Sequence, residues 1–120
     1  MGTMIDVSDV LPLQPRVFWI LLVLSEAPRH GYAILKETRR RSDVNVGLGP
    51  TTLYRLLYGL VDSGLVESVE PPDPDADERR QYYGLTELGE RVLSAEVERL
   101  ERMVKLGRSA LGQAAVERGR

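Results

Sequence analysis

The segment from Gly49 to Gly64, GPTTLYRLLYGLVDSG, constrains the fold of this 120-residue chain more than any other stretch. Its apolar residues recur at i, i+3, i+4, i+7 and i+8, which is the spacing of one buried stripe on a helix and not of a strand. Pro50 suits the first helical turn, and Gly64 suits a left-handed stop after the last turn. The predicted buried stripe consists of Leu53, Leu56, Leu57, Leu60 and Val61.

The opposite face of this predicted helix carries polar and aromatic side chains, which are Thr51, Thr52, Arg55 and Tyr58. Hydroxyl and guanidinium groups near the start of an exposed helix are suited to contact phosphates and base edges in a DNA groove. An ordinary amphipathic surface helix has the same pattern. The segment by itself therefore leaves both interpretations open.

The composition excludes several classes of site. The chain has no cysteine and one histidine, so disulfides, thiolate metal sites and histidine-rich metal centres are excluded, and we expect no cofactor. A net charge of −2 supplies no global basic field for nucleic acid. The apolar stretch 17–24 is too short to span a bilayer, and acidic residues precede it. We expect one cytoplasmic domain without a membrane segment.

Two further helices are predicted before residue 49. Residues 1–14 form a flexible N-terminal arm, and a largely apolar helix follows over 15–26. A second helix runs from about residue 30 to 41 and ends in a basic cluster that includes Lys36 and Arg40. These cations either complement the helix dipole or clamp a DNA phosphate beside the third helix.

Residues 65–85 predict a two-stranded β-hairpin. LVESVE at 65–70 alternates like a half-buried strand, and RRQYYGL at 79–85 is the returning strand. The DPDADE run between them has Glu78 where a calcium loop requires glycine, so we interpret it as a solvated acidic tip. Arg79 and Arg80 at the hairpin base are placed to meet an adjacent phosphate or the minor groove.

The last predicted helix spans residues 86–115, followed by a disordered tail at 116–120. Thr86 is its expected N-cap. An apolar seam with heptad spacing and charged flanks favours a helix that pairs with a second copy of the chain. The predicted dimerisation residues are Leu93, Val97, Leu100, Val104 and Leu111.

The order of these elements predicts the fold class. It is mainly α with a two-stranded β-hairpin (α+β): a winged helix-turn-helix over residues 15–85 and a long C-terminal helix. No hydrolytic triad, phosphate-binding glycine loop or metal-ligand spacing is present, so we do not expect an enzyme.

Three motifs in this order resemble the PadR family of bacterial transcriptional regulators. They are HGYAILKE at 30–37, TTLYRLLYGLVDSGLV at 51–66 and RRQYYGLTELGE at 79–90. The resemblance covers roughly residues 13–105. The short chain with one C-terminal helix is similar to the small subgroup with a single C-terminal dimerisation helix.

The resemblance implies a homodimeric repressor that binds double-stranded DNA and leaves its operator when a small-molecule effector binds. It places Thr51, Thr52, Arg55 and Tyr58 on the recognition helix, with Tyr54 at the edge of the buried stripe. Arg79 and Arg80 then belong to the wing, with one of the two tyrosines that follow them.

The chain departs from the family pattern at two places. Thr51 stands where the family often has glycine, and the C-terminal helix lacks the aromatic residue that multidrug-binding relatives use to stack ligands. Phe18 and Trp19 are then the remaining candidates to contact an aromatic effector. An alternative function, favoured by the acidic charge balance, is a winged-helix module that binds protein without specific DNA binding.

Overall fold

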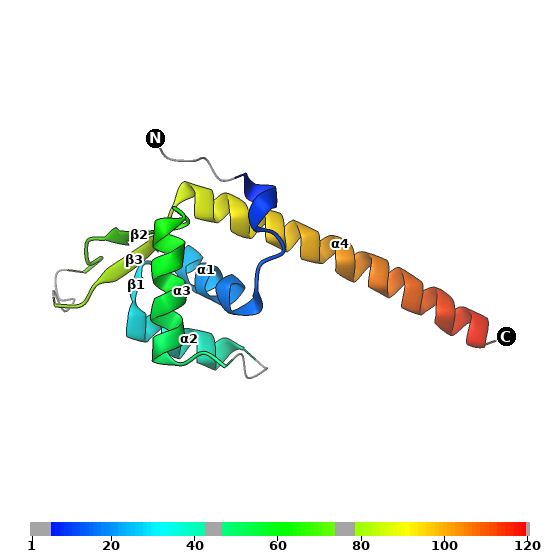
Figure 1. The fold of residues 1–120 in the computed structure, drawn as a ribbon. Helices are drawn as coiled ribbons and strands as arrows, with labels where there is room; N and C mark the ends of the chain where they lie inside the picture. Colours follow the sequence, from blue (N-terminus) through cyan, green and yellow to red (C-terminus); the bar gives the residue numbers. More distant parts are fainter. Residues whose placement is uncertain (1–5, 43–46, 74–78, 120) are drawn as a thin grey trace.

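The computed structural model describes residues 6–42, 47–73 and 79–119 (Figure 1). The helices are η1 (Val7–Val10, a 3-10 helix), α1 (Pro15–Glu26), α2 (Gly31–Arg41), α3 (Pro50–Asp62) and α4 (Glu87–Arg118). The strands are β1 (Arg29–His30), β2 (Val66–Val69) and β3 (Tyr82–Leu85). The predicted mainly helical winged-helix architecture with a long C-terminal helix is confirmed. The predicted acidic tip at 74–78 lies outside the described residues.

The predicted hairpin is formed by β2 and β3, which pair antiparallel with Val66 opposite Leu85. A third strand, β1, pairs with the other edge of β3 and sets His30 opposite Tyr82, giving the sheet order β1-β3-β2. The hairpin prediction was therefore incomplete, because a strand of two residues is too short to show an alternating pattern. Through β1, the sheet is connected directly to the start of α2.

The core lies between α1, α2, α3 and the first turns of α4, against one face of the small sheet (Figure 1). From the predicted stripe of α3, Leu53, Leu57 and Leu60 are buried, and Leu56 and Val61 pack against them half-buried. Their burial supplies the hydrophobic stabilisation of the third helix and fixes which of its faces points outward.

Helix α4 begins as the sequence indicates and ends later than expected. The Thr86 hydroxyl accepts a hydrogen bond from the Gly89 amide at 3.0 Å, which caps the first turn. The helix continues to Arg118, so residues 116–118 are helical and not part of a disordered tail. Its distal half projects away from the body (Figure 1). Among the described residues, no helix is both long and apolar enough to cross a membrane.

The described part of the N-terminal arm is ordered against α4. Residues 7–10 form η1, which contacts α4, and the Leu13 amide donates to the Glu96 carboxylate at 2.8 Å. Arg99 donates to the same carboxylate from the next turn of α4. Part of the predicted arm thus packs on α4, through η1 and through the bond of the Leu13 amide to a buried carboxylate.

Candidate nucleic-acid interface

The outward face of α3 carries the predicted recognition residues on an accessible surface. Thr51, Tyr54, Arg55 and Tyr58 are exposed, and Thr52 is half-buried. The rings of Tyr54 and Tyr58 lie 6.0 Å apart, centroid to centroid. Because the buried stripe holds the opposite face in the core, these side chains share one orientation.

The turn that precedes α3 is held by Arg39. Its Nε donates to the Leu48 carbonyl at 3.2 Å, two residues before α3 begins. Gly47 adopts a φ of 66° in the same turn, a left-handed conformation that favours glycine. The sequence showed Arg39 only as one member of a basic cluster, because its partner is a backbone carbonyl whose position depends on the fold.

The basic end of α2 is paired with carboxylates. Glu37 accepts hydrogen bonds from Arg40 at 2.8 Å and Arg41 at 3.0 Å. The Arg40 hydrogen bond is the main reason that the pKa of Glu37 is lowered to about 2. Lys36 is exposed. Arg40 can reach a phosphate only by exchanging its bond to Glu37, and exposed pairs of this kind contribute little to stability.

Arg79 and Arg80 lie just before β3, which starts at Tyr82, so the prediction that they belong to the strand is wrong. Both side chains are exposed in the wing segment 79–81, which leads from the hairpin tip into β3. The Arg80 Nη1 atom lies 3.2 Å from Nδ1 and 3.1 Å from Nε2 of His30. His30 is itself fixed, because its Nδ1 accepts a hydrogen bond from the Ala33 amide at 3.1 Å and caps α2. This contact connects the wing segment 79–81 to the start of α2.

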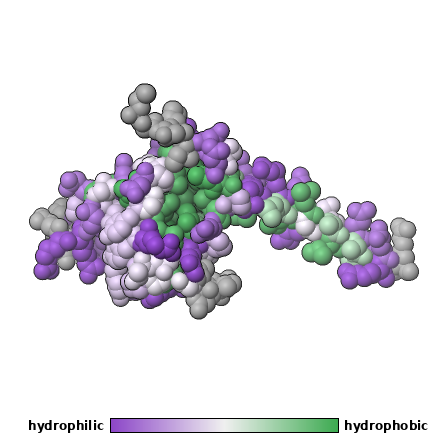
Figure 2. Space-filling model, in the orientation of Figure 1, coloured by the Kyte–Doolittle hydropathy of each residue, from purple (hydrophilic) through white to green (hydrophobic). Residues whose placement is uncertain are grey.

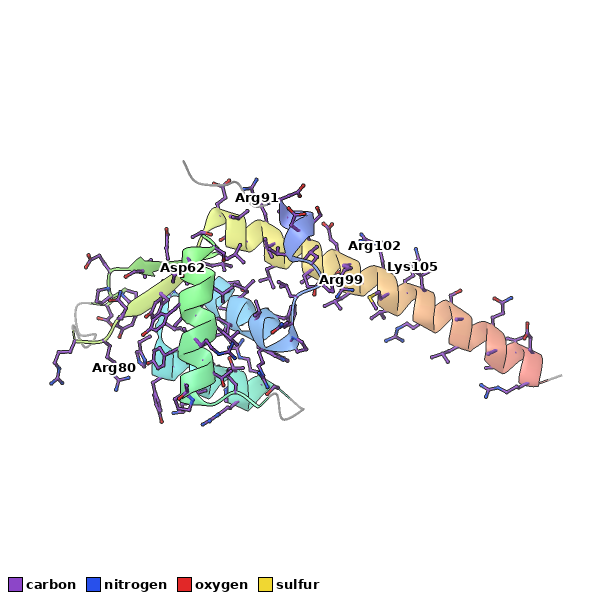
Figure 3. The ribbon with its side chains drawn as sticks, in the orientation of Figure 1. Asp62, Arg80, Arg91, Arg99, Arg102 and Lys105 are labelled. Carbon is purple, nitrogen blue, oxygen red and sulfur yellow. The ribbon has the colours of Figure 1, made fainter. Side chains whose placement is uncertain are left out.

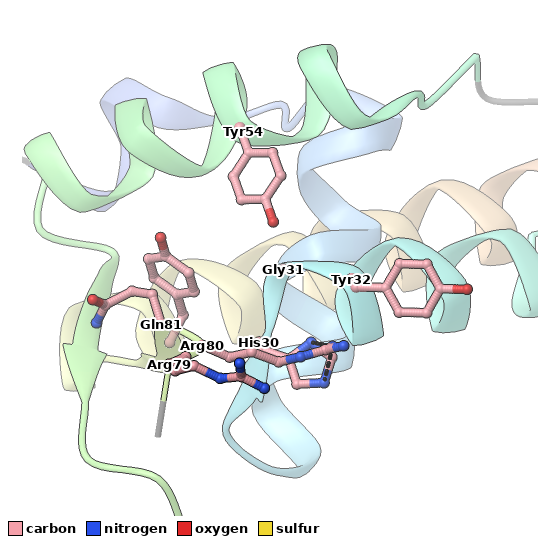
Figure 4. Close-up of a pocket in the computed structure, with 8 residues that line it drawn as sticks. His30, Gly31, Tyr32, Tyr54, Arg79, Arg80 and Gln81 are labelled. Atoms are coloured by element: carbon pink, nitrogen blue, oxygen red, sulfur yellow. Dashed lines mark hydrogen bonds between the residues drawn. The ribbon is translucent and has the colours of Figure 1, made fainter. Parts of the chain in front are cut away.

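A polar pocket of about 370 Å³ lies between α3, the start of α2 and the wing segment 79–81 (Figure 4). Arg79, Arg80, His30, Gln81 and Tyr54 are among its lining residues. The sequence pointed to the two arginines and Tyr54 but not to His30 or Gln81. His30 lies 50 residues from Arg80, and only the pairing of β1 with β3 brings them together.

Tyr54 extends toward α2 because residue 31 is glycine (Figure 4). A Cβ at position 31 would lie 2.5 Å from the Tyr54 Oη and 2.7 Å from its Cζ. Any larger residue would push the phenol ring away. The close approach of α3 to the start of α2 therefore depends on Gly31.

The predicted dimerisation residues divide into two groups. Leu93 is 8% exposed and belongs to the core of its own chain, so its assignment to an intermolecular seam is wrong. Val97, Val104 and Leu111 are exposed, and Leu100 is half-buried. Figure 2 shows hydrophobic surface that continues from the body along the projecting part of α4. The sequence did not show the difference because Leu93 belongs to the same heptad-spaced apolar seam as the others.

Phe18 and Trp19, the predicted effector contacts, are both half-buried on α1. Their rings meet edge to face at 5.9 Å. Phe18 also lines an apolar hollow of about 480 Å³ with Val97, Leu100 and Val104 of α4. Within the described ranges, no cluster of three or more histidine or acidic residues is arranged to hold a metal ion.

A family model described as "Transcriptional regulator PadR-like family" matches residues 20–95, which include α2, α3, the wing and the start of α4. The chain belongs to the PadR-like family. The match covers well over half of the 120 residues and contains the whole candidate interface. A search of curated proteins returned no match.

Solved structures resemble this PadR-like chain over most of its length. A PadR family transcription regulator from Clostridium difficile R20291 is 26% identical, with a TM-score of 0.69, covering 82% of this chain and 99% of that one. A transcriptional regulator from Clostridium thermocellum is 27% identical, with a TM-score of 0.63 and coverages of 88% and 97%. H. salinarum RosR is 29% identical, with a TM-score of 0.58 and coverages of 90% and 99%. These similarities identify the fold of a PadR-family transcriptional regulator.

Proposed function

We propose that this PadR-like chain is a homodimeric repressor that recognises an inverted-repeat operator and releases it when an effector binds. The observation that supports DNA recognition is the exposed face of α3, where Thr51, Arg55 and Tyr58 point away from a core that fixes their orientation. Arg39 braces the turn before this face. A braced helix with outward hydroxyl and guanidinium groups is suited to the major groove.

The roles of the site residues follow from their positions. Arg55, exposed in the first half of α3, makes a bidentate base contact, and Thr51 and Thr52 at the helix start contact phosphate or base edges. Tyr54 and Tyr58 contact the sugar-phosphate backbone beside it. Arg79 and Arg80 bind the backbone from the wing, and Lys36 and Arg40 from α2.

The exposed apolar surface of α4 supports a homodimer. Val104 and Leu111 are 52% and 69% exposed on a part of the helix that projects from the body (Figure 1). A second copy covers this stripe with its own α4, because an isologous interface uses the same patch twice. The two-fold axis then sets the two α3 helices about 34 Å apart, one turn of DNA, and selects an inverted repeat.

Effector release is assigned to the hollow between α1 and α4. Phe18 provides an aromatic contact there, Trp19 supports it from the same helix, and α4 supplies the facing aliphatic side chains. A small apolar molecule bound between these helices changes how α4 leaves the body. Because α4 connects the two copies, such a change alters the spacing of the recognition helices.

A winged-helix module that binds protein is the second candidate. The net charge of −2 favours it, because the molecule as a whole does not attract a polyanion. The exposed tyrosines of α3 are also compatible with a protein partner.

Selection of bound fragments from the genomic DNA of the host, followed by a salt titration on the recovered sequences, separates the two candidates. Recovery of one inverted repeat is the expected result. Its affinity should fall about 10³–10⁵-fold between 50 and 200 mM salt if the dimer makes roughly 6–10 phosphate contacts. No enrichment, or weak binding that ignores sequence, would contradict the repressor and favour the protein-binding module.

A further inference from the structure

The polar pocket between α3, α2 and the wing segment 79–81 has the chemistry of an oxyanion site. Arg79 and Arg80 supply two guanidinium groups and Tyr54 supplies a phenol hydroxyl, whereas the Gln81 amide donates to Ser68 on β2. Guanidinium and hydroxyl donors around one concave surface are suited to the oxygens of a phosphate.

Arg80 is oriented toward this pocket by two rings from the start of α2. Its Nη1 is nearly equidistant from both ring nitrogens of His30, which places it over the ring face and not on one lone pair. The Arg80 Cζ also lies 6.0 Å from the centroid of the Tyr32 ring, and the His30 and Tyr32 rings are stacked 6.5 Å apart. Stacking restricts the rotamers of a long side chain, so less conformational entropy is lost when it binds an anion.

The location of the pocket identifies the source of the phosphate. Tyr54 lines it from α3, the same helix whose outward face carries Arg55, and the arginines line it from the wing segment before β3 (Figure 4). A duplex that lies against α3 runs its backbone past the groove between α3 and the wing. An anion bound here therefore lies next to the duplex and contacts α3, the proposed recognition helix.

We propose that this pocket seats one backbone phosphate of bound duplex DNA, with Arg80 as its ligand and His30 and Tyr32 as positioning residues. This inference rests on the proposed DNA-binding function and adds a defined contact to it. Gly31 is also required for the pocket, because a side chain at position 31 would displace Tyr54 from it.

The test measures binding of a fluorescent 30-base-pair duplex of random sequence as salt is raised from 50 to 200 mM. Because the proposed homodimer carries two copies of Arg80, Arg80→Ala should lower the slope of log Kobs against log salt by about 1.8, or about 0.9 per copy. Its binding then falls about twelvefold less than that of the wild type over this range. Arg91→Ala is the matched control. Arg91 is an exposed arginine on α4, away from Arg80 (Figure 3), and its loss should leave the slope unchanged.

His30→Asn tests the positioning role separately. Asparagine is a good N-cap and can keep the hydrogen bond to the Ala33 amide, whereas it removes the ring beneath Arg80. We expect weaker duplex binding by several-fold with an unchanged melting temperature. Binding equal to the wild type would contradict the role assigned to His30.

The outcomes distinguish this inference from the proposed function. If the wild type binds the duplex and the salt slopes of Arg80→Ala and Arg91→Ala are equal, the proposed phosphate site is contradicted. The proposed DNA-binding function is then unaffected. If the wild type binds neither this duplex nor any genomic fragment, both are wrong. A third measurement is the melting temperature in inorganic phosphate at constant ionic strength. If phosphate raises the melting temperature of the wild type but not of Arg80→Ala, and the duplex slopes are equal, the site binds a free anion instead of DNA.

Discussion

Glu96 is the only buried charged side chain among the residues that the structure describes, at 2% exposed. The cost of burying a carboxylate is offset because Arg99 and the Leu13 amide both donate to it. The Arg99 hydrogen bond is the larger cause, and the Leu13 amide a further one, of the lowered pKa of Glu96. One side chain therefore connects the N-terminal arm to α4.

Glu96→Gln should lower the free energy of unfolding by about 1–3 kcal/mol, because a charge-assisted hydrogen bond is replaced by a neutral one. The folded pKa lies below the ordinary 4.5, so the stabilisation is full above pH 4.5 and is lost as the pH falls through the folded pKa. Urea unfolding of wild type and Glu96→Gln at pH 7 and at pH 3 measures this difference in the free energy of unfolding. Glu98→Gln, an exposed change on the same helix, is the control and should have little effect. A difference from wild type that persists undiminished at pH 3 would contradict the ionic role.

Arg55→Ala should weaken binding to the selected operator by about 1–3 kcal/mol and relax specificity at one base pair, because a bidentate guanine contact is lost. Competition binding with operators varied at single positions measures both effects. Arg102→Ala removes an exposed arginine of α4 and should change neither. Unchanged affinity and unchanged preference in Arg55→Ala would remove Arg55 from base recognition.

At the scale of elements, the packing of α4 on the hairpin requires a close backbone approach. A Cβ at Gly89 would collide with the Leu65 carbonyl and would lie 2.6 Å from Leu85 Cδ1. Gly89 itself is buried in the first turn of α4, next to the Thr86 cap. The angle at which α4 leaves the winged domain is thus set at a glycine.

Gly89→Ala should destabilise the fold by about 1–3 kcal/mol, since the backbone carbonyl it meets cannot rotate away. Gly112→Ala is the matched control on the same helix, where an added Cβ meets nothing within 4 Å. Its higher helix propensity should stabilise α4 by up to about 1 kcal/mol. Thermal melting of the two variants compares them, and equal melting temperatures would contradict the close-approach argument.

At the scale of the whole molecule, the chain is more extended than a compact domain of its length. Its radius of gyration is 17.7 Å and its longest extent is 65 Å. A compact domain of this length would have a radius of roughly 14 Å. The difference comes from the projecting half of α4, whose large apolar side chains Met103, Leu106 and Val116 are all at least 55% exposed. A surface of this kind is typical of an interface between copies.

Val104→Asp should give a folded monomer, because residue 104 is 52% exposed in the single chain and the change leaves its core intact. A charge in the covered seam is costly without a partner. Light scattering after size-exclusion chromatography measures the mass, and circular dichroism measures the helix content. Arg102→Asp changes an exposed residue of the same segment and should remain dimeric. A Val104→Asp protein that stays dimeric would place the interface elsewhere.

The sequence by itself determined the local elements. The α3 stripe, the Thr86 cap and the hairpin depend on interactions within a few residues or between adjacent strands, so spacing and residue type are sufficient to predict them. The three family motifs further predicted the winged-helix architecture, and the PadR-like match confirms it.

The tertiary structure decided which members of a pattern are buried and which distant residues meet. Leu93 and Val104 share one heptad stripe, but only Leu93 reaches the core, because the body ends before α4 does. Strand β1 brings His30 beside Arg80, and Gly31 admits Tyr54 to the same pocket. These contacts join segments far apart in the sequence, so their positions depend on the packing of the entire core and leave no periodic trace along the chain.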